Sequence, residues 1–273
     1  MKENETPGYT VVDGPGPTSD SSHRGSILVN DEYGYEDEPA DPSEWAEGWL
    51  TSPRLKPYLV ACAGDFEKAL DLYEWNLAVA QILDRDIAHF EVALRNAYDR
   101  VMRETWGDGW LLDGTSPVQK PIVRTNKRGK QTDLNRVSRK TIKYAEAGLP
   151  RSHTRDDLVA ALTLGFWVYL GDRPREAKIW RTGLYKAWPK GTNRAELQKR
   201  LLGILHTRNR VAHPERLFDP NGSCPPPTVA ERDAIDLFRT LCPDAATWVY
   251  GVDEELPLER FLRQYPAPPG VIV

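Results

Sequence analysis

The chain has 273 residues, of which 40% are hydrophobic, so it can bury a real core in one large domain or two small ones. Its three cysteines (Cys62, Cys224, Cys242) show no metal-ligand spacing, which argues against a zinc or disulfide framework and favours a reduced cytoplasm. The net charge of −4 is unevenly spread along the chain. The N-terminus does not resemble a secretory signal. The longest apolar run, Leu158 to Leu170, is too short to span a membrane.

The first 42 residues differ in composition from the rest of the chain. They carry ten acidic side chains against Lys2 and Arg24, whereas the remaining residues carry a net charge of +4. This segment is also rich in Gly, Pro and Ser and poor in aliphatic residues, a composition typical of chains that do not fold. We therefore expect residues 1–42 to form a disordered acidic tail, which either keeps the protein soluble or covers a basic surface elsewhere.

From residue 43 onward, apolar residues recur with helical spacing. SEWAEGWL predicts a short helix, and SPRLKPYLVACAG predicts a second one with Ser52 as its N-cap and Pro53 at its first position. Residues 65–107 form a long helical tract, either one helix or two that meet near residues 84–86, with Gly107 at the end.

Four further segments complete the predicted helices: DLVAALTLGFWVYLG, EAKIWRTGLYKAW, NRAELQKRLLGILHTRNRVAH and TVAERDAIDLFRTLC. The first is expected to be a single buried helix with Gly171 as its C-cap. No stretch alternates convincingly between apolar and polar residues, and hairpin signals are few. We therefore predict an all-α protein with one folded domain at residues 43–273 and no internal repeat. Five tryptophans are assigned to the core in preference to base-stacking platforms: Trp75, Trp106, Trp110, Trp167 and Trp180.

Residues 119–143, QKPIVRTNKRGKQTDLNRVSRKTIK, form a strongly basic segment. Asp133 is their only acid, against nine basic residues: Lys120, Arg124, Lys127, Arg128, Lys130, Arg136, Arg139, Lys140 and Lys143. Such a one-sided cluster is a candidate RNA-binding surface, because polyanion binding is driven by charge neutralisation and counterion release. The alternative is a solvated loop and helix face without a ligand.

The end of the helix before residue 213 carries a candidate catalytic pair. Its apolar face is marked by Leu197, Leu201, Ile204 and Leu205, and the continuation of that face passes through Arg208. Pro214 disfavours helical conformation in the residue before it, so we expect His213 at the helix end with its imidazole free to turn. Arginine can grip a phosphate through two N–H groups, and histidine exchanges protons near neutral pH. Together they suit phosphodiester cleavage.

A second candidate group lies in FEVALRNAYDR. Glu91 and Arg95 are four residues apart, in the order that favours an ion pair along a helix, and Asn96 follows them. The pair is either structural, or Arg95 or Asn96 lines a functional cleft.

Several stretches together resemble the Abi-like (abortive infection) branch of the HEPN superfamily. The sequence RNRVAH resembles the Arg-x4–6-His motif of HEPN domains, and the wider resemblance, over about residues 45 to 250, includes SPRLKPYL, LYEWN, FEVALRNAYDRV, GDGWLLD, DDLVAALTLGFW and LHTRNRVAHPE. The resemblance implies a HEPN-type helical bundle that forms a homodimer and brings two copies of the motif into one cleft. It also implies RNA cleavage without a metal or cofactor, by attack of the ribose 2′-hydroxyl to leave a 2′,3′-cyclic phosphate.

On this resemblance, Arg208 and His213 would be the catalytic pair and Asn209 the residue that orients them, with Glu91, Arg95 and Asn96 as candidates for the cleft wall. Many relatives are toxins or act in defence against phage, which implies RNA as a partner and an antitoxin of unknown kind. The chain has Glu215 where toxins modified by a nucleotidyltransferase carry a tyrosine, and Pro214 where Abi-like proteins often carry a second histidine. The alternatives are a non-catalytic HEPN module that binds RNA or a protein, and a plain helical interaction protein.

Overall fold

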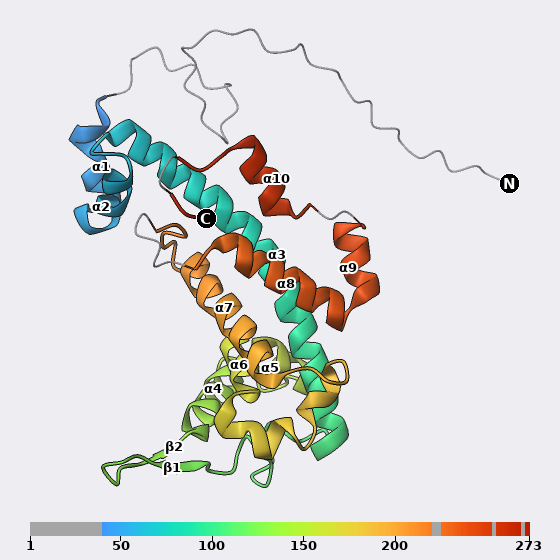
Figure 1. The fold of residues 1–273 in the computed structure, drawn as a ribbon. Helices are drawn as coiled ribbons and strands as arrows, with labels where there is room; N and C mark the ends of the chain where they lie inside the picture. The colour runs from blue at the N-terminus through green and yellow to red at the C-terminus, as the bar shows by residue number, and fades with distance from the viewer. Residues whose placement is uncertain (1–39, 220–224, 253–254, 269–270) are drawn as a thin grey trace, which may run out of the picture. The chain divides into compact units, whose positions relative to one another are not determined.

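The computed structural model describes residues 40–219, 225–252, 255–268 and 271–273, so the predicted tail lies, except for residues 40–42, outside the described residues. Within these ranges the fold is all-α, as predicted (Figure 1). The α-helices are α1 (Pro42–Leu50), α2 (Ser52–Ala61), α3 (Phe66–Trp106), α4 (Asn135–Ala147), α5 (Arg155–Ala161), α6 (Leu164–Leu170), α7 (Arg194–Ala212), α8 (Pro227–Leu241), α9 (Pro243–Tyr250) and α10 (Pro257–Gln264). The helix predicted for EAKIWRTGLYKAW is wrong, because three short helical segments that are not α-helical join α6 to α7: the 3-10 turn η1 (Arg173–Arg175), the π-helical turn η2 (Glu176–Trp180) and the 3-10 turn η3 (Leu184–Ala187).

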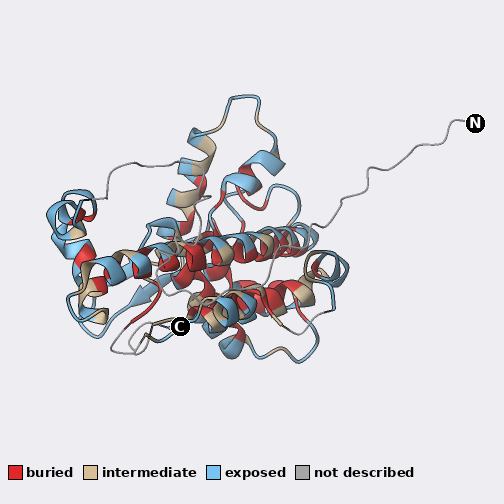
Figure 2. Cartoon of the chain, turned by 90° about the horizontal axis from the view of Figure 1, so that it is seen from above, coloured by how far each residue is buried: buried red, intermediate tan, exposed pale blue. Residues whose placement is uncertain are grey.

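The long tract is one uninterrupted helix, α3, of 41 residues, and not two. It begins where the Asp65 side chain accepts a hydrogen bond from the Lys68 backbone N–H, and it ends at Gly107, whose φ of 82° favours glycine. At 1.5 Å per residue it is about 60 Å long. Helices α2, α7 and α8 pack along it, and the buried residues gather on the facing sides of the long helices (Figure 2).

Two predicted helix boundaries are wrong. Thr51 is the N-cap of α2, while Ser52 is the first helical residue and donates its hydroxyl to Glu47 Oε2 at 2.9 Å. The expected single helix up to Gly171 is broken at Leu162 and Thr163, whose backbones are extended. The break separates α5 from α6, and α6 then packs against α7, where a Cβ on Gly165 would lie 3.8 Å from Leu205.

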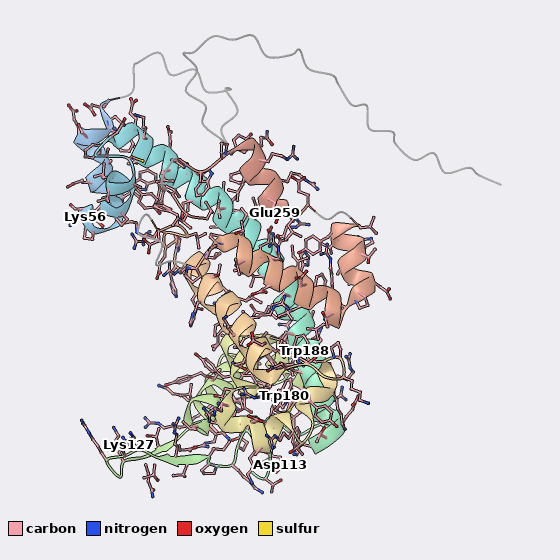
Figure 3. The ribbon with its side chains drawn as sticks, in the orientation of Figure 1. Lys56, Asp113, Lys127, Trp180, Trp188 and Glu259 are labelled. Atoms are coloured by element: carbon pink, nitrogen blue, oxygen red, sulfur yellow. The ribbon has the colours of Figure 1, made fainter. Side chains whose placement is uncertain are left out.

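The basic segment also contains a short antiparallel hairpin that the sequence pattern does not predict. It consists of β1 (Val123–Thr125) and β2 (Gln131–Asp133), with Val123 opposite Asp133 and Thr125 opposite Gln131. Nearly all of its residues are exposed, so it has no alternation of apolar and polar residues that could have revealed it. The hairpin extends from the helical body, and Lys127 lies at its outer end (Figures 1 and 3).

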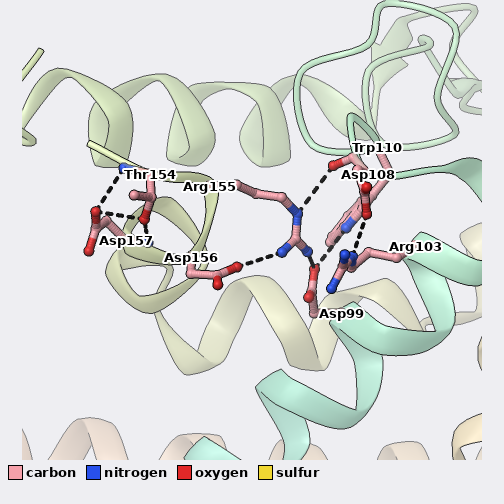
Figure 4. Close-up of polar contacts among 8 residues, drawn as sticks. All are labelled: Asp99, Arg103, Asp108, Trp110, Thr154, Arg155, Asp156 and Asp157. Atoms are coloured by element: carbon pink, nitrogen blue, oxygen red, sulfur yellow. Dashed lines mark hydrogen bonds and ion pairs between the residues drawn. The ribbon is translucent and has the colours of Figure 1, made fainter. Parts of the chain in front are cut away.

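A polar network fixes the start of α5 against the end of α3 (Figure 4). Asp99 of α3 accepts a hydrogen bond from the indole N–H of Trp110 at 2.9 Å and forms an ion pair with Arg155. Arg155 also donates to the Asp108 carbonyl at 3.2 Å, and Thr154 caps α5 through a reciprocal pair of bonds with Asp157. Trp110 is fully buried, so the GDGWLLD stretch serves as a structural joint between these helices.

Candidate functional site

The end of α7 has the local structure that the sequence predicts. Residues Leu197, Leu201, Ile204 and Leu205 are buried, and the helix stops at Ala212. His213 is the C-cap, and its backbone N–H donates to the Asn209 carbonyl at 3.2 Å, while its side chain is exposed. The helix therefore ends directly before Pro214, because proline disfavours helical conformation in the preceding residue.

Arg208, which continues the apolar face of α7, lies opposite an acidic residue of α3. Its Nε lies 3.9 Å from Oε2 of Glu91, and the side chains of Arg208 and Glu91 are 35% and 19% exposed. Burial raises the pKa of Glu91, while Arg208, Arg95 and the Leu164 backbone N–H act in the opposite direction. A separation of 3.9 Å is too long for a hydrogen bond, so the guanidinium is attracted to Glu91 without being fixed to it.

Arg95 does not form the ion pair along α3 that its spacing from Glu91 suggests. Its Nη1 donates instead to the Ala160 carbonyl, at 3.2 Å, near the C-terminal end of α5. Asn96 is exposed on α3. The structure thus brings Glu91 to Arg208, uses Arg95 to hold α5, and leaves Asn96 on the surface.

Asn209 occupies another side of α7. It lines a cavity of about 270 Å³ together with His206, Thr207, Arg210, Glu215, Leu217, Pro225 and Pro227. Arg208 and His213 are not among the lining residues. Five residues of α-helix correspond to a rotation of about 140°, so Arg208 and His213 of one chain leave the helix in different directions.

The basic segment forms the hairpin and helix α4. Asn126 shapes the hairpin loop, because its Oδ1 accepts hydrogen bonds from the backbone N–H groups of Arg128 and Lys130, at 2.9 and 3.0 Å. Gly129 has a φ of 74°, which only glycine adopts without strain. The exposed members of the predicted RNA-binding set are Lys120, Arg124, Lys127, Arg128, Lys130, Arg136 and Lys140, and Lys143 is exposed as well.

Arg139 differs from the other basic residues of this segment. It pairs with Asp133, the only acid of the segment, and donates to the Gln119 carbonyl at 3.1 Å. Asp133 also accepts hydrogen bonds from the backbone N–H groups of Ile122 and Asn135, both at 3.0 Å. Arg139 therefore stabilises the base of the hairpin. Lys140 lies over the Tyr144 ring, 5.2 Å from its centre.

A buried polar pair anchors α4 to the rest of the fold. Asn135 is fully buried, and its amide donates to the carbonyls of Pro117 and Lys120, at 2.6 and 2.7 Å. Its Oδ1 accepts a hydrogen bond at 2.9 Å from Arg175, which is 4% exposed. Arg175 also pairs with Asp172 at 2.5 Å. These buried hydrogen bonds hold in place the helix that carries the exposed cations of the segment.

Residues 173–194 form a second basic segment, which is not among the predicted sites. It contains seven basic residues and a single acid, Glu176, and three aromatic residues lie between them: Trp180, Tyr185 and Trp188. The charge balance of this segment, read from the sequence alone, marks it as a second candidate for binding an anion.

In the described ranges, no group of three or more His, Cys, Asp and Glu side chains is placed to hold a metal ion. No helix in the same ranges has both the length and the apolar character needed to cross a bilayer. Comparisons with protein-family models, with curated proteins and with solved structures found no match to the chain.

Proposed function

We propose that this protein is a metal-independent endoribonuclease of the HEPN type that acts in the cytoplasm as a homodimer, as a toxin or an anti-phage abortive infection effector. The observation that supports it best is that the last turns of α7 carry both an exposed histidine, His213, and a partly exposed arginine, Arg208, that is only loosely held. The resemblance of the sequence to Abi-like HEPN proteins gives this pair its expected chemistry.

In the proposed reaction, His213 removes the proton of a ribose 2′-hydroxyl, and the 2′-oxygen attacks the adjacent phosphorus. The new bond from phosphorus to the 2′-oxygen closes a 2′,3′-cyclic phosphate, and the bond to the 5′-oxygen breaks. The leaving 5′-oxygen takes up a proton and becomes a hydroxyl. Arg208 stabilises the negative charge that gathers on the phosphate oxygens during the attack.

A single chain does not bring the two side chains together, so the proposal depends on a second copy. Because Arg208 and His213 leave α7 about 140° apart, one copy presents them toward different directions. Two copies that meet at the ends of their α7 helices can place the arginine of one beside the histidine of the other. A second histidine then supplies the proton that the leaving oxygen needs.

The decisive experiment is RNA cleavage by the purified protein in EDTA, with analysis of the product ends. We expect products with a 2′,3′-cyclic phosphate and a 5′-hydroxyl, and loss of cleavage in His213→Ala and Arg208→Ala. His206→Ala is the matched control, because His206 is also exposed and lies on the same helix. Absence of cleavage, or cleavage that survives His213→Ala, contradicts the proposal.

One observation favours a second function, a non-catalytic HEPN-type module that binds RNA or a protein. Arg208 faces Glu91, so its charge is already partly neutralised and it can serve to join α3 to α7. In that case the parent protein binds its ligand without turnover, and His213→Ala binds it equally well.

A further inference from the structure

The chain between α6 and α7 forms a surface cavity outside the candidate catalytic site. Its volume is about 550 Å³, which lies in the range of small-molecule binding sites. The side chains that matter for its chemistry are Trp180, Arg181, Tyr185, Lys186, Trp188 and Lys190. Trp180 and Trp188 both line the cavity, and Figure 3 labels them on this part of the chain.

The aromatic residues give the cavity both a fixed wall and an open rim. Trp180 and Trp188 are 8% and 6% exposed, so they belong to the core as much as to the cavity, whereas Tyr185 is 48% exposed. The indole N–H of Trp188 donates to the hydroxyl of the buried Tyr98 at 3.1 Å, and the two rings meet edge to face. The prediction that Trp180 is buried is confirmed, and the same ring also lines the cavity.

The charge around the cavity is strongly positive. Arg181 forms an ion pair with Glu176 at 2.7 Å, and Glu176 is shared with Arg194. Lys186 and Lys190 are exposed, and neither has an acidic partner among the residues that the structure describes. Two cations at the rim are therefore available to a ligand that carries negative charge.

The backbone that carries these side chains is held firmly. A Cβ on Gly183 would lie 2.5 Å from Oγ1 of Thr105, so this turn lies directly against α3. In the cavity wall itself, Thr192 donates its hydroxyl to the Pro189 carbonyl at 2.7 Å, and Gly191 has a φ of 91°. A site that exists before the ligand arrives loses less entropy on binding.

We infer that this cavity binds an unpaired base of single-stranded RNA. The base stacks on Tyr185 beside the edges of the two tryptophans, and Lys186 and Lys190 contact the neighbouring phosphates. An aromatic surface interleaved with cations is the arrangement that binds single strands with little sequence preference, because every base has a face that can stack. The inference rests on the proposed function only in that it takes the ligand to be RNA.

The test is fluorescence anisotropy with a labelled single-stranded RNA of 12 nucleotides, in EDTA, on proteins that all carry His213→Ala so that no cleavage occurs. We expect Tyr185→Ala to raise Kd about tenfold, and Tyr185→Phe to bind like its parent, because the ring and not the hydroxyl stacks. Trp248→Ala is the matched control: this exposed aromatic residue on α9 lies outside the cavity, so its removal should leave Kd unchanged. Lys186→Gln with Lys190→Gln should weaken binding and reduce its salt dependence.

Unchanged Kd in a folded Tyr185→Ala protein would overturn the inference, as would equally strong competition by duplex RNA. The assay also separates this inference from the proposed function. If the protein with His213 intact does not cut RNA but Tyr185→Ala loses binding, the nuclease is wrong and the cavity site stands. If the protein cuts RNA and Tyr185→Ala cuts it with an unchanged KM, the cavity site is wrong and the nuclease stands.

Discussion

Glu91 of α3 and Arg208 of α7 face each other across the helix interface, with 3.9 Å between Oε2 and Nε. The carboxylate is the more buried of the two, and burial raises its pKa. The arginine therefore satisfies a charge that would otherwise be costly inside the interface, while it keeps enough exposure to meet a phosphate. The same side chain can hold two helices together and contact RNA.

This relationship predicts that the two residues are coupled in stability. Arg208→Gln should lower the free energy of unfolding by about 1 kcal/mol, because it leaves Glu91 half-buried with less compensation. Glu91→Gln added to Arg208→Gln should recover most of that loss, because it removes the charge left without its partner. Urea unfolding of the two single variants and the double variant measures the coupling. Strictly additive effects would show that the two side chains do not interact.

A pair of buried acids on the other side of α3 should make stability depend on pH. Asp86 and Glu231 are both fully buried. The Tyr250 hydroxyl donates to Asp86 Oδ1 at 2.9 Å, and the Leu258 backbone N–H donates to Glu231 Oε1 at 2.6 Å. The remaining oxygens, Asp86 Oδ2 and Glu231 Oε2, receive no hydrogen bond from the described residues. A single proton shared between Asp86 Oδ2 and Glu231 Oε2 gives both of these oxygens a hydrogen-bond partner.

Burial, together with the nearby Asp86, raises the pKa of Glu231 to about 8. Because the folded state has the higher pKa, it holds a proton that the unfolded chain loses. The stabilisation that the folded state gains from holding this proton is complete below the pKa of an unfolded glutamate, near 4.3. It is lost as pH rises to about 8. We expect the free energy of unfolding to fall by a few kcal/mol across this window, and Glu231→Gln to flatten the curve. Urea titrations at several pH values test this, and a parent curve that rises from pH 5 to 8 contradicts it.

The sequence could predict the helices that bury an apolar stripe, because their spacing follows from the helix itself. The end of α7 at His213 was predictable for the same reason, since Pro214 acts locally. The break between α5 and α6 was not, because DLVAALTLGFWVYLG is apolar on both sides of Thr163 and the two helices pack differently, α5 against α3 and α4, and α6 against α3 and α7.

The residues that contact the candidate site residues could not be predicted from the sequence either. The spacing of Glu91 and Arg95 pointed to a pair within one helix, but the partner of Glu91 is 117 positions further along the chain, at Arg208. The partner of Arg95 is a carbonyl of α5. Local spacing carries no information about contacts of this kind, which depend on how α3, α5 and α7 pack.

The hairpin tip should contribute to RNA affinity mainly through charge. Replacing Lys127, Arg128 and Lys130 with Gln removes three exposed cations that the Asn126 loop holds together. We expect weaker binding of RNA of any sequence, and a slope of log K against log salt that falls by about 0.7 for each lost phosphate contact. Lys56→Gln is the control, because this exposed lysine lies on α2, far from the hairpin (Figure 3). Identical salt slopes for the triple variant and the parent would remove the hairpin from the RNA-binding surface.

Two glycines allow a matched test of the packing that supports the cavity. Gly183 lies so close to α3 that a Cβ would meet Thr105 at 2.5 Å, whereas a Cβ on Gly203, inside α7, would meet nothing within 4 Å. Gly183→Ala should therefore destabilise the protein by about 1–3 kcal/mol, as overpacking does. Gly203→Ala should stabilise it by about 0.5–1 kcal/mol, because alanine favours the helix and no contact opposes it. Thermal unfolding of both variants measures the difference, and the opposite order of Tm would mean that the turn at Gly183 is not packed against Thr105.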